Sequence, residues 1–418
     1  MRLPKYSIGM GDRFAHQGPA QLDALIRARR RNCSIAPVWN KSYREHAITG
    51  SRPEDVRREA DAAVAARDWT DAYFVDADHV NLDTVDAFIE SSDFFTLDVA
   101  DYIGVDPRAK DLTRFVEKYK QYIGRVQVPG INRLLSVSMK TLVGVARTFL
   151  SAVKEAGRIY RHIVEIKGTD ALVVEISVDE ADRPQTPLEL LFILAAVADE
   201  GIPVQTVAPR FTGRFNKGID YIGNVRRFRG EFEENLAVIA FAVHFFGLPE
   251  NLKLSVHSGS DKFSLYQPMY KALQKFDAGV HLKTAGTTWL EELIGLAAAG
   301  GDGLAVAREI YRIALSRRDE LCTPYASVIG IDPARLPSAE TVDSLTGEAF
   351  AALVRHDPAC EGYNPFVRQL LHVGCKVAAE MGGRFTDALE KHADVIADNV
   401  TENLYERHIR PLFLGDRP

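Results

Sequence analysis

AYFVDADHVNLDTVDAFIESSDFFTLDVAD, residues 72–101, contains the unit from which this chain is built. Residues 72–79 and 94–101 are short runs of mainly aromatic and aliphatic residues, which is typical of strands. Residues 82–91, which lie between them, have their apolar side chains at helical spacing. A strand, a helix and a second strand in succession form the connection that a parallel sheet requires. The stretch therefore predicts an α/β fold with parallel strands.

The same alternation of strand and helix recurs along the chain. We expect eight strands, at residues 6–13, 33–40, 72–79, 94–101, 172–180, 203–210, 253–258 and 279–284. Eight strands, each followed by a helix, are the number that a (β/α)8 barrel requires. The alternative is an open doubly wound sheet, but no predicted strand ends in the G-x-G-x-x-G turn of that fold. We therefore predict an α/β fold of the TIM-like (β/α)8 barrel type.

Two long segments fall outside the repeating unit. Residues 105–168 have mostly helical spacing, interrupted at 126–132, and we interpret them as a helical insertion after the fourth strand. Residues 301–418 contain no convincing strand and predict a helical C-terminal extension. The expected organisation is a catalytic barrel in residues 1–300, which includes the insertion, with the extension packed on it. Residues 288–299 are expected to form the helix that packs after the eighth strand.

The composition argues against several classes of protein. Hydrophobic residues make up 46% of the chain and charged residues 26%, which is typical of globular proteins. The net charge of −6 argues against sequence-independent binding to nucleic acid, which depends on clustered positive charge. The longest apolar stretches, 188–197 and 236–248, are shorter than the roughly 20 residues of a membrane span. Four cysteines without a C-x-x-C pair indicate neither a cysteine zinc site nor a disulfide scaffold, so we expect a soluble, cytoplasmic protein.

Carboxylates are expected inside the barrel, near the ends of two strands. Alternate residues of a barrel strand face the axis, and function gathers at the C-terminal ends of the strands. This alternation directs Asp76 and Asp78 of the third predicted strand toward the axis. In the fifth predicted strand it directs Glu175 and Asp179 there.

Two of these carboxylates are candidates for proton transfer. Enzymes commonly use carboxylates as general acid and general base, and Asp78 and Glu175 lie close to the rim of the predicted barrel. Burial of Glu175 is costly unless the carboxylate is paired or coordinated. The alternative for Glu175 is therefore a structural ion pair with Lys283 or Arg210.

Three of the eleven histidines fall at the C-terminal ends of predicted strands: His79, His257 and His281. Neutral imidazole is a common ligand of zinc, manganese and nickel, and three protein ligands with an open position are typical of catalytic sites. Each histidine alone is better explained as a hydrogen-bonded structural residue. Their convergence beside carboxylates favours a site for a divalent metal cation.

Basic side chains near the strand ends are candidates for binding an anionic or polyhydroxylated ligand. HSGSDKF at 257–263 could wrap such a ligand and present Lys262, and the alternative is an ordinary polar loop. Arg368 and His372 lie one helical turn apart, and an arginine can bind both oxygens of a carboxylate. The alternative for that pair is an interhelical polar contact. The candidate substrate-binding residues are Arg13, Arg210, Lys262, Lys283, Arg368 and His372.

Several segments resemble the tagaturonate/fructuronate epimerase family of hexuronate catabolism. They are GMGDRF at 9–14, DADHV at 76–80, FTLDVAD at 95–101, EISVDEADRPQTPL at 175–188, APRFTGRFNKGIDYIG at 208–223, SVHSGSDKFS at 255–264, HLKTAGT at 281–287 and VRQLLHV at 367–373. The segments occur in the order of the family and cover most of the chain. Two of them, SVHSGSDKFS and HLKTAGT, are long and specific.

The resemblance implies a divalent-metal-dependent epimerase that interconverts D-tagaturonate and D-fructuronate. It implies that His79, His257 and His281 are the metal ligands. It also implies that Asp78 is the proton acceptor and Glu175 the proton donor. The same residues stand out from their positions at or near the C-terminal ends of the predicted strands.

The substrates themselves suggest a mechanism. The two uronates differ at C3, whose hydrogen is not acidic because C3 is β to both the C5 ketone and the carboxylate. A retro-aldol step would break the C3–C4 bond, with Asp78 removing the C3 hydroxyl proton, Lewis-acid stabilisation of the enolate by the metal, and Lys283 near the oxyanion. Transient oxidation with bound NAD is disfavoured because no dinucleotide fingerprint is present. The alternatives are a related epimerase or aldolase for another sugar acid, and a barrel that binds a sugar acid without turning it over.

Overall fold

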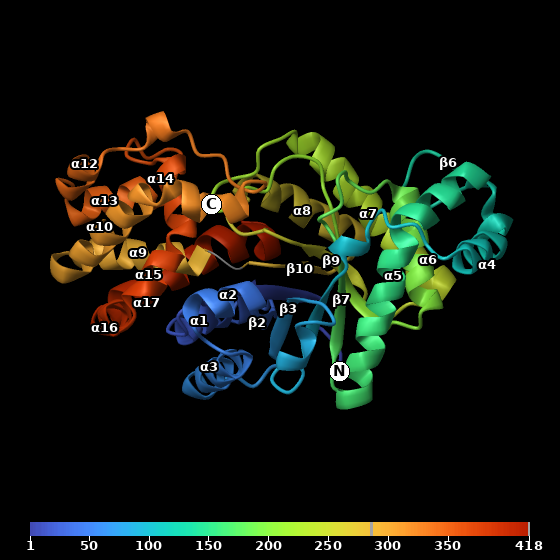
Figure 1. Ribbon diagram of the computed structural model, residues 1–418, viewed down its shortest axis with the longest axis horizontal. Helices are drawn as coiled ribbons and strands as arrows, with labels where there is room; N and C mark the ends of the chain where they lie inside the picture. Colours follow the sequence, from blue (N-terminus) through green and yellow to red (C-terminus); the bar gives the residue numbers. More distant parts are fainter. Residues whose placement is uncertain (285–286, 417–418) are drawn as a thin grey trace.

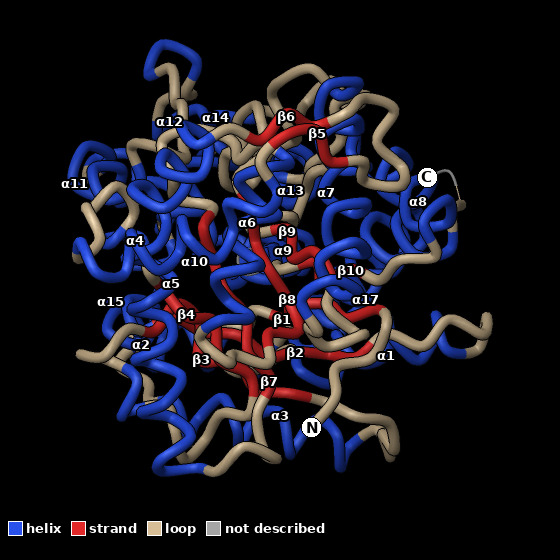
Figure 2. The backbone as a smooth tube through the Cα atoms, turned by 90° about the vertical axis from the view of Figure 1, so that its right-hand side faces the viewer, coloured by secondary structure: helices blue, strands red, loops and turns tan. Residues whose placement is uncertain are grey.

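The strands form a closed parallel barrel in the computed structural model, which describes residues 1–284 and 287–416. The barrel strands are β1 (Tyr6–Met10), β2 (Ala36–Ser42), β3 (Phe74–Val80), β4 (Phe94–Asp98), β7 (Val173–Val178), β8 (Val204–Pro209), β9 (Lys253–Val256) and β10 (Val280–Leu282). They follow one another around the barrel in chain order, and β10 closes it against β1. Figures 1 and 2 show the strands at the centre of the molecule, enclosed by helices. The predicted (β/α)8 barrel is confirmed.

Helices follow most of the strands on the outside of the barrel. They are α1 (Gly18–Arg29) after β1, α3 (Pro53–Ala66) after β2, α5 (Met139–Lys167) after β4, α6 (Pro187–Asp199) after β7, α7 (Val225–Phe246) after β8 and α8 (Phe263–Phe276) after β9. Their starts are encoded locally, as α6 illustrates. The Thr186 side chain accepts a hydrogen bond from the Glu189 backbone, the Glu189 side chain accepts one from the Thr186 backbone, and Pro187 opens the helix.

The segment after β3 departs from the prediction of a helix at 82–91. It contains only a short 3-10 helix, η1 (Val85–Ala87), between turns. The Asn81 side chain accepts hydrogen bonds from the Asp83 backbone at 3.0 Å and from the Thr84 hydroxyl at 3.1 Å. Such local side-chain bonds hold the backbone in a turn and compete with the hydrogen bonds of an α-helix.

The helix that covers the barrel between α8 and α1 comes from the end of the chain, whereas the sequence predicts residues 288–299 there. The helix after β10, α9 (Thr287–Ala299), packs against the C-terminal helices, and Trp289 is buried in their core. Instead, the π-helix η6 (Asn403–Leu414) lies between α8 and α1 and buries Ile409 and Leu412 in the core of the barrel. Ala285 and Gly286 of the HLKTAGT segment lie outside the described residues.

The segment 105–168 is only partly an insertion. It begins with α4 (Ala109–Tyr119) and continues into two short antiparallel strands, β5 (Gly124–Val126) and β6 (Leu135–Val137). The predicted interruption at 126–132 is the connection between these strands. The remainder is α5, which packs against β4 and α6 and is therefore the barrel's own helix after β4.

The C-terminal helices form a second hydrophobic core beside the barrel. They are α10 (Gly301–Ser316), α11 (Arg318–Cys322), α12 (Ala339–Asp343), α13 (Gly347–Val354), α14 (Pro365–Val373), α15 (Cys375–Met381), α16 (Gly383–Lys391) and α17 (Ala393–Glu402). Figure 1 shows them on the side of the barrel opposite α4 and α5. Their core includes Leu293, Tyr311, Phe350 and Phe385.

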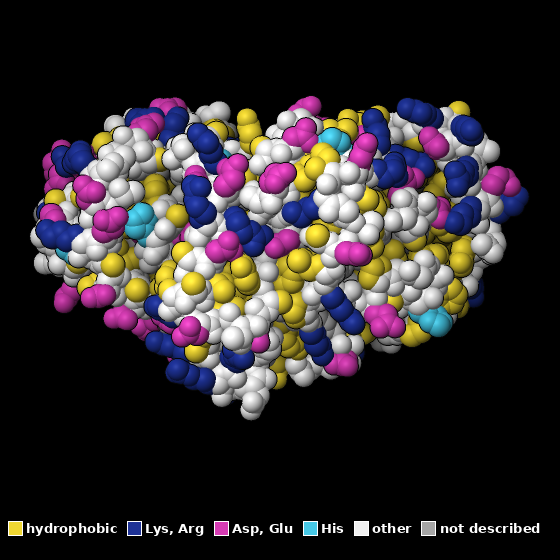
Figure 3. Space-filling model, turned by 90° about the horizontal axis from the view of Figure 1, so that it is seen from below, with side chains coloured by type: hydrophobic (Ala, Val, Ile, Leu, Met, Phe, Trp, Pro, Cys, Tyr) yellow, Lys and Arg dark blue, Asp and Glu magenta, His cyan; other side chains and the backbone are white. Residues whose placement is uncertain are grey.

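The surface carries mixed charge. On the face shown in Figure 3, Lys and Arg side chains are interspersed with Asp and Glu side chains. This distribution agrees with the nearly balanced totals of 51 basic and 57 acidic residues. Among the residues that the structure describes, no helix combines the length and the apolar character that crossing a membrane requires.

The interior of the barrel changes from apolar to polar along the strands. Near the N-terminal ends, a small cluster of apolar side chains fills the axis and includes Val38, Phe74, Phe94 and Val173. Further along β3, the inward positions become aspartates, beginning with Asp76. The apolar side chains therefore lie toward the N-terminal ends of the strands and the aspartates toward the C-terminal ends, where function gathers in this fold.

Candidate active site

A single buried lysine holds three carboxylates together inside the barrel. Lys283 Nζ lies 2.7 Å from Asp78 Oδ1, 2.9 Å from Asp76 Oδ2 and 3.2 Å from Glu175 Oε1. All four side chains are buried. The Thr96 hydroxyl bridges Asp76 and Glu175, with distances of 3.0 Å to Asp76 Oδ1 and 3.2 Å to Glu175 Oε1. The inward direction that alternation predicts for these residues agrees with this cluster.

The three carboxylates and the ammonium control one another's ionisation. Burial opposes the charge on Lys283, but the three carboxylates outweigh it and hold the pKa of the lysine well above its ordinary value. Burial also opposes the charge on Asp78, but Lys283 and His79 hold the pKa of that carboxyl below its ordinary value. Burial, reinforced by the charges of Asp78 and Glu175, raises the pKa of Asp76 to about 6 despite the opposing effect of Lys283. One positive charge therefore does not neutralise this group of acids.

His79 reaches the same site because the end of β3 is irregular. Strict alternation would direct His79 away from the axis, since Asp78 before it points inward. The pairing of β3 with β4 shifts register between Ala77 and Val80, and His79 has a left-handed backbone with φ of 56°. Bulges of this kind re-aim side chains next to functional sites. As a result, His79 Nδ1 lies 2.7 Å from Asp78 Oδ1.

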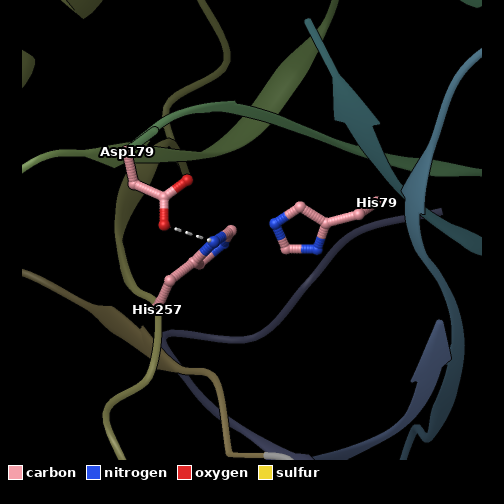
Figure 4. A group of neighbouring side chains, drawn as sticks. All are labelled: His79, Asp179 and His257. Atoms are coloured by element: carbon pink, nitrogen blue, oxygen red, sulfur yellow. Dashed lines mark ion pairs between the residues drawn. The ribbon is translucent and has the colours of Figure 1, made fainter. Parts of the chain in front are cut away.

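His257, just beyond β9, lies between two carboxylates. Its Nε2 is 2.7 Å from Glu175 Oε1, and its Nδ1 is 3.3 Å from Asp179 Oδ2. The rings of His79 and His257 have centroids 5.0 Å apart. Figure 4 shows His79, His257 and Asp179 directed toward one another from three different parts of the barrel. Their potential ligand atoms all lie within 4.8 Å of one another.

These three residues fit a divalent cation. Two imidazoles and one carboxylate are ligands that zinc and other divalent transition metals accept. Each histidine has one ring nitrogen against a carboxylate, since His79 Nδ1 contacts Asp78 and His257 Nε2 contacts Glu175. Carboxylates in that position orient the imidazole of a metal-binding histidine. The other nitrogen of His257, Nδ1, is buried and faces Asp179 Oδ2 at 3.3 Å without a hydrogen bond, so both atoms are available as ligands of one cation.

His281, the third histidine of the predicted ligand set, is not part of this group. His281 of β10 is paired with Ser255 of β9, and Leu282 is paired with Val256. The residue level with His257 along the barrel axis is therefore Lys283, and not His281. His281 lies one inward position deeper, where its Nδ1 is 3.0 Å from Ser7 Oγ. Burial lowers the pKa of its imidazole to about 3. Asp179 is the third member of the group instead of His281. The sequence did indicate an inward direction for Asp179, from the alternation of side chains along its strand.

Comparisons with known proteins identify the family of this chain. A family model described as tagaturonate epimerase, UxaE, matches residues 1–410. The chain belongs to the tagaturonate epimerase family. The resemblance seen in the sequence motifs is thereby confirmed, and the enzyme class of this family is isomerase.

Relatives of this family member cover nearly its whole length. The tagaturonate/fructuronate epimerase of Thermotoga maritima is 28% identical over an alignment of 424 positions, which covers 96% of this chain and 80% of that protein. A crystal structure of fructuronate-tagaturonate epimerase UxaE from Cohnella laeviribosi, in complex with one glycerol, has a TM-score of 0.78 at 23% identity, over 97% of this chain and 82% of that one. A second structure of that protein, with two glycerols, has a TM-score of 0.79 at 24% identity, over 98% and 81%. These structures share the fold of this tagaturonate epimerase family member.

Two of the predicted substrate-binding residues are committed to contacts within the protein. Lys262 Nζ donates to the backbone carbonyls of Asn216, Ile219 and Ser260 at 2.8–2.9 Å, which uses all three of its N–H groups. Arg368 donates to the Gly218 carbonyl at 2.6 Å, the Val354 carbonyl at 2.9 Å and Asp261 Oδ1 at 3.1 Å. The predicted substrate role is therefore corrected for both: in this member of the tagaturonate epimerase family, they hold loops and helices together.

The other predicted basic residues lie near the barrel mouth. Arg13, which follows β1, donates from NH1 to the His372 carbonyl at 3.1 Å and from Nε to Glu45 Oε1 at 3.1 Å. The structure therefore brings the predicted residues Arg13 and His372 together, although the contact uses the backbone of His372. Arg210 is half-buried and approaches the carbonyl of Asp179 at 3.4 Å, beside the candidate metal ligands.

Proposed function

We propose that this protein inverts C3 of hexuronates and so interconverts D-tagaturonate and D-fructuronate, with a divalent cation at His79, His257 and Asp179. The observation that carries the proposal is the contact of one ammonium, Lys283, with both Asp78 and Glu175 next to that candidate metal group. The curated relative and the solved structures with this fold have names that state the same activity.

The bond changes of a retro-aldol route balance without a further reactant. The C3 hydroxyl loses its proton, the C3–C4 bond breaks, and its electron pair forms an enolate over C4, C5 and the ketone oxygen. The C3 aldehyde then turns about the C2–C3 bond and presents its other face. The enolate carbon attacks that face, C3–C4 forms again, and the new C3 alkoxide takes back a proton.

The residues of the Lys283 cluster suit the two proton movements. Asp78 accepts the C3 hydroxyl proton, and Glu175 returns a proton to C3 oxygen after the aldehyde has turned. Lys283 Nζ lies 2.7 Å from Asp78 and 3.2 Å from Glu175, so the ammonium can give one of its own protons to Glu175 and then regain one from Asp78. Glu175 Oε2 is buried without a hydrogen-bond partner among the described residues, which leaves it an acceptor for a substrate hydroxyl.

The candidate metal ligands surround the same space. A bound divalent cation would supply Lewis-acid stabilisation of the negative charge that develops on the ketone oxygen. His79, His257 and Asp179 would hold it, and Asp78 and Glu175 would orient the two imidazoles. Lys283 adds a fixed positive charge that stabilises the same oxyanion.

The direct test is NMR of purified protein, supplied with Zn²⁺, Mn²⁺ or Ni²⁺, and incubated with D-tagaturonate. We expect D-fructuronate to appear, and the reverse reaction to give the same equilibrium mixture. Occasional release of tartronate semialdehyde and dihydroxyacetone would support C3–C4 cleavage. Net conversion to these fragments would indicate an aldolase, and binding of uronate without any change would indicate a sugar-acid-binding protein.

A further inference from the structure

Cationic side chains gather around one tyrosine where the C-terminal helices meet the barrel mouth. The Arg44 guanidinium lies 5.9 Å and the Lys217 ammonium 5.8 Å from the centroid of the Tyr325 ring. Arg44 belongs to α2 (Tyr43–Thr49), Lys217 to the loop after β8, and Tyr325 to the 3-10 helix η4 (Thr323–Tyr325) of the C-terminal part. Three segments far apart in the sequence therefore build this cluster together.

Lys217 is held in place by its backbone while its charge has no counterion. Its backbone N–H donates to the Val328 carbonyl at 2.9 Å, which ties the β8 loop to the C-terminal helices. Within residues 1–284 and 287–416, neither Lys217 nor Arg44 forms an ion pair. Lys217 is half-buried, and a charge that leaves bulk water costs free energy unless a partner compensates it. Burial and the nearby charge of Arg13 lower the pKa of Lys217, which reflects that missing partner.

The cations here outnumber the acids. Glu45 acts on both Arg13 and Lys217, but its Oε1 pairs with Arg13 at 3.1 Å and its Oε2 accepts a hydrogen bond from the Ser42 backbone at 3.1 Å. Glu45 is therefore already engaged with Arg13 and Ser42 and does not form an ion pair with Lys217. The Lys283 cluster has the opposite imbalance, with three carboxylates on one ammonium.

The cluster of cations around Tyr325 lies at the same end of the barrel as the cluster of carboxylates around Lys283. Ser42, the last residue of β2, is paired with Asp78 of β3, and Arg44 follows two residues later in α2, so the cluster lies at the same end of the barrel as the proposed proton acceptor. A hexuronate has its carboxylate two bonds from C3, the carbon that is inverted. A group that binds this carboxylate must therefore adjoin the residues that handle the C3 hydroxyl.

We infer that Lys217 and Arg44, positioned over Tyr325, bind the carboxylate of the hexuronate. This inference rests on the proposed function and names the part of the site that distinguishes an acid sugar from a neutral one. The carboxylate supplies the counterion that Lys217 and Arg44 lack within the protein. It also gives the C-terminal helices a part in substrate recognition through Tyr325.

The test is the affinity for D-tagaturonate, measured by titration calorimetry on metal-loaded protein. We expect Lys217→Met to weaken binding about 10- to 100-fold, the range of a hydrogen bond to a charged group, and Lys217→Arg to retain most of the affinity. Lys110→Met is the matched control, because Lys110 is exposed on α4 and the substitution removes the same charge. D-tagatose, which has CH2OH in place of the carboxylate, should bind wild type and Lys217→Met equally.

The affinities of the two sugars for wild type and for Lys217→Met either support or overturn the inference. Unchanged affinity of Lys217→Met for D-tagaturonate, or an equal loss for D-tagatose, would overturn the inference. Lys217-dependent binding without inversion of C3 would overturn the proposed epimerase and leave the carboxylate site standing. A wild type that does not bind D-tagaturonate would contradict both. Because the hydrogen bond to Val328 uses the backbone of Lys217, the substitutions leave that loop contact in place.

Discussion

Two buried ionic clusters in this protein differ in how completely their charges are matched. At the barrel mouth, Lys283 faces three carboxylates, and Glu175 Oε2 has no partner within the described residues. Beside the C-terminal helices, Arg368 pairs with Asp261 at 3.1 Å and fills its other donors with backbone carbonyls. The first cluster has three carboxylates on one ammonium. In the second, Arg368 faces two carboxylates, Asp261 at 3.1 Å and Glu291 at 3.8 Å, and His356 lies 3.5 Å from Asp261.

The difference shows that burial and charge do not by themselves identify a site. Arg368 and Lys283 are equally plausible ligands for a substrate when only the sequence is considered. Both are buried, and burial of an unmatched charge costs several kcal/mol. What distinguishes them is how many carboxylates each cation faces, three for Lys283 and two for Arg368, and that backbone carbonyls take the other donors of Arg368. An imbalanced cluster can bind and transform a ligand, and a matched one stabilises the fold.

The largest expected effect is on catalysis at the imbalanced cluster. Asp78→Asn and Glu175→Gln preserve shape and remove the group that transfers protons, so each should lower kcat by about 10²- to 10⁴-fold. The measurement is the rate of C3 inversion by NMR, with bound metal determined in the same samples. Asp387→Asn is the matched control, because the Asp387 side chain is exposed on α16, and it should leave the rate unchanged. Full activity of both variants would remove the pair from the mechanism.

The next effect is on stability at the matched cluster. Arg368→Met leaves Asp261 as a buried charge without its guanidinium, so the free energy of unfolding should fall by about 3–5 kcal/mol. Urea unfolding followed by circular dichroism measures this loss. The double variant with Asp261→Asn should recover part of it, because the unpaired charge is then gone. If Arg368→Met instead left stability intact and raised KM strongly, Arg368 would be a substrate ligand, as the sequence first indicated.

The smallest effect tests which third residue completes the metal group. Asp179→Asn should weaken metal binding at least about 10-fold, whereas His281→Asn should keep one metal ion per chain, because His281 is bonded to Ser7 one position deeper. Metal content after dialysis against a graded series of chelator concentrations measures both. The opposite ranking of these two variants would restore His281 as the ligand that the family resemblance implies.

The sequence by itself determined the barrel and the inward direction of its functional side chains. Side chains of a strand alternate between two faces, so residue numbers within β3 and β7 already place Asp76, Asp78 and Glu175 on the axis. The eight strand runs are likewise local patterns, and all eight are present in the structure. Such features need only the residues of one element and its neighbours in the chain.

Tertiary structure alone decided three further features. The height of His281 relative to His257 depends on the stagger between β9 and β10, which neither strand encodes by itself. The position of η6 between α8 and α1 depends on the apolar surface that these two helices, which are distant in the sequence, present together. Two of the three carbonyls that accept hydrogen bonds from Lys262, those of Asn216 and Ile219, are 46 and 43 residues away in the sequence. Contacts between distant segments therefore determine which charged residues can bind a ligand. A donor or acceptor that already has a hydrogen-bond partner within the protein is not free to bind the substrate.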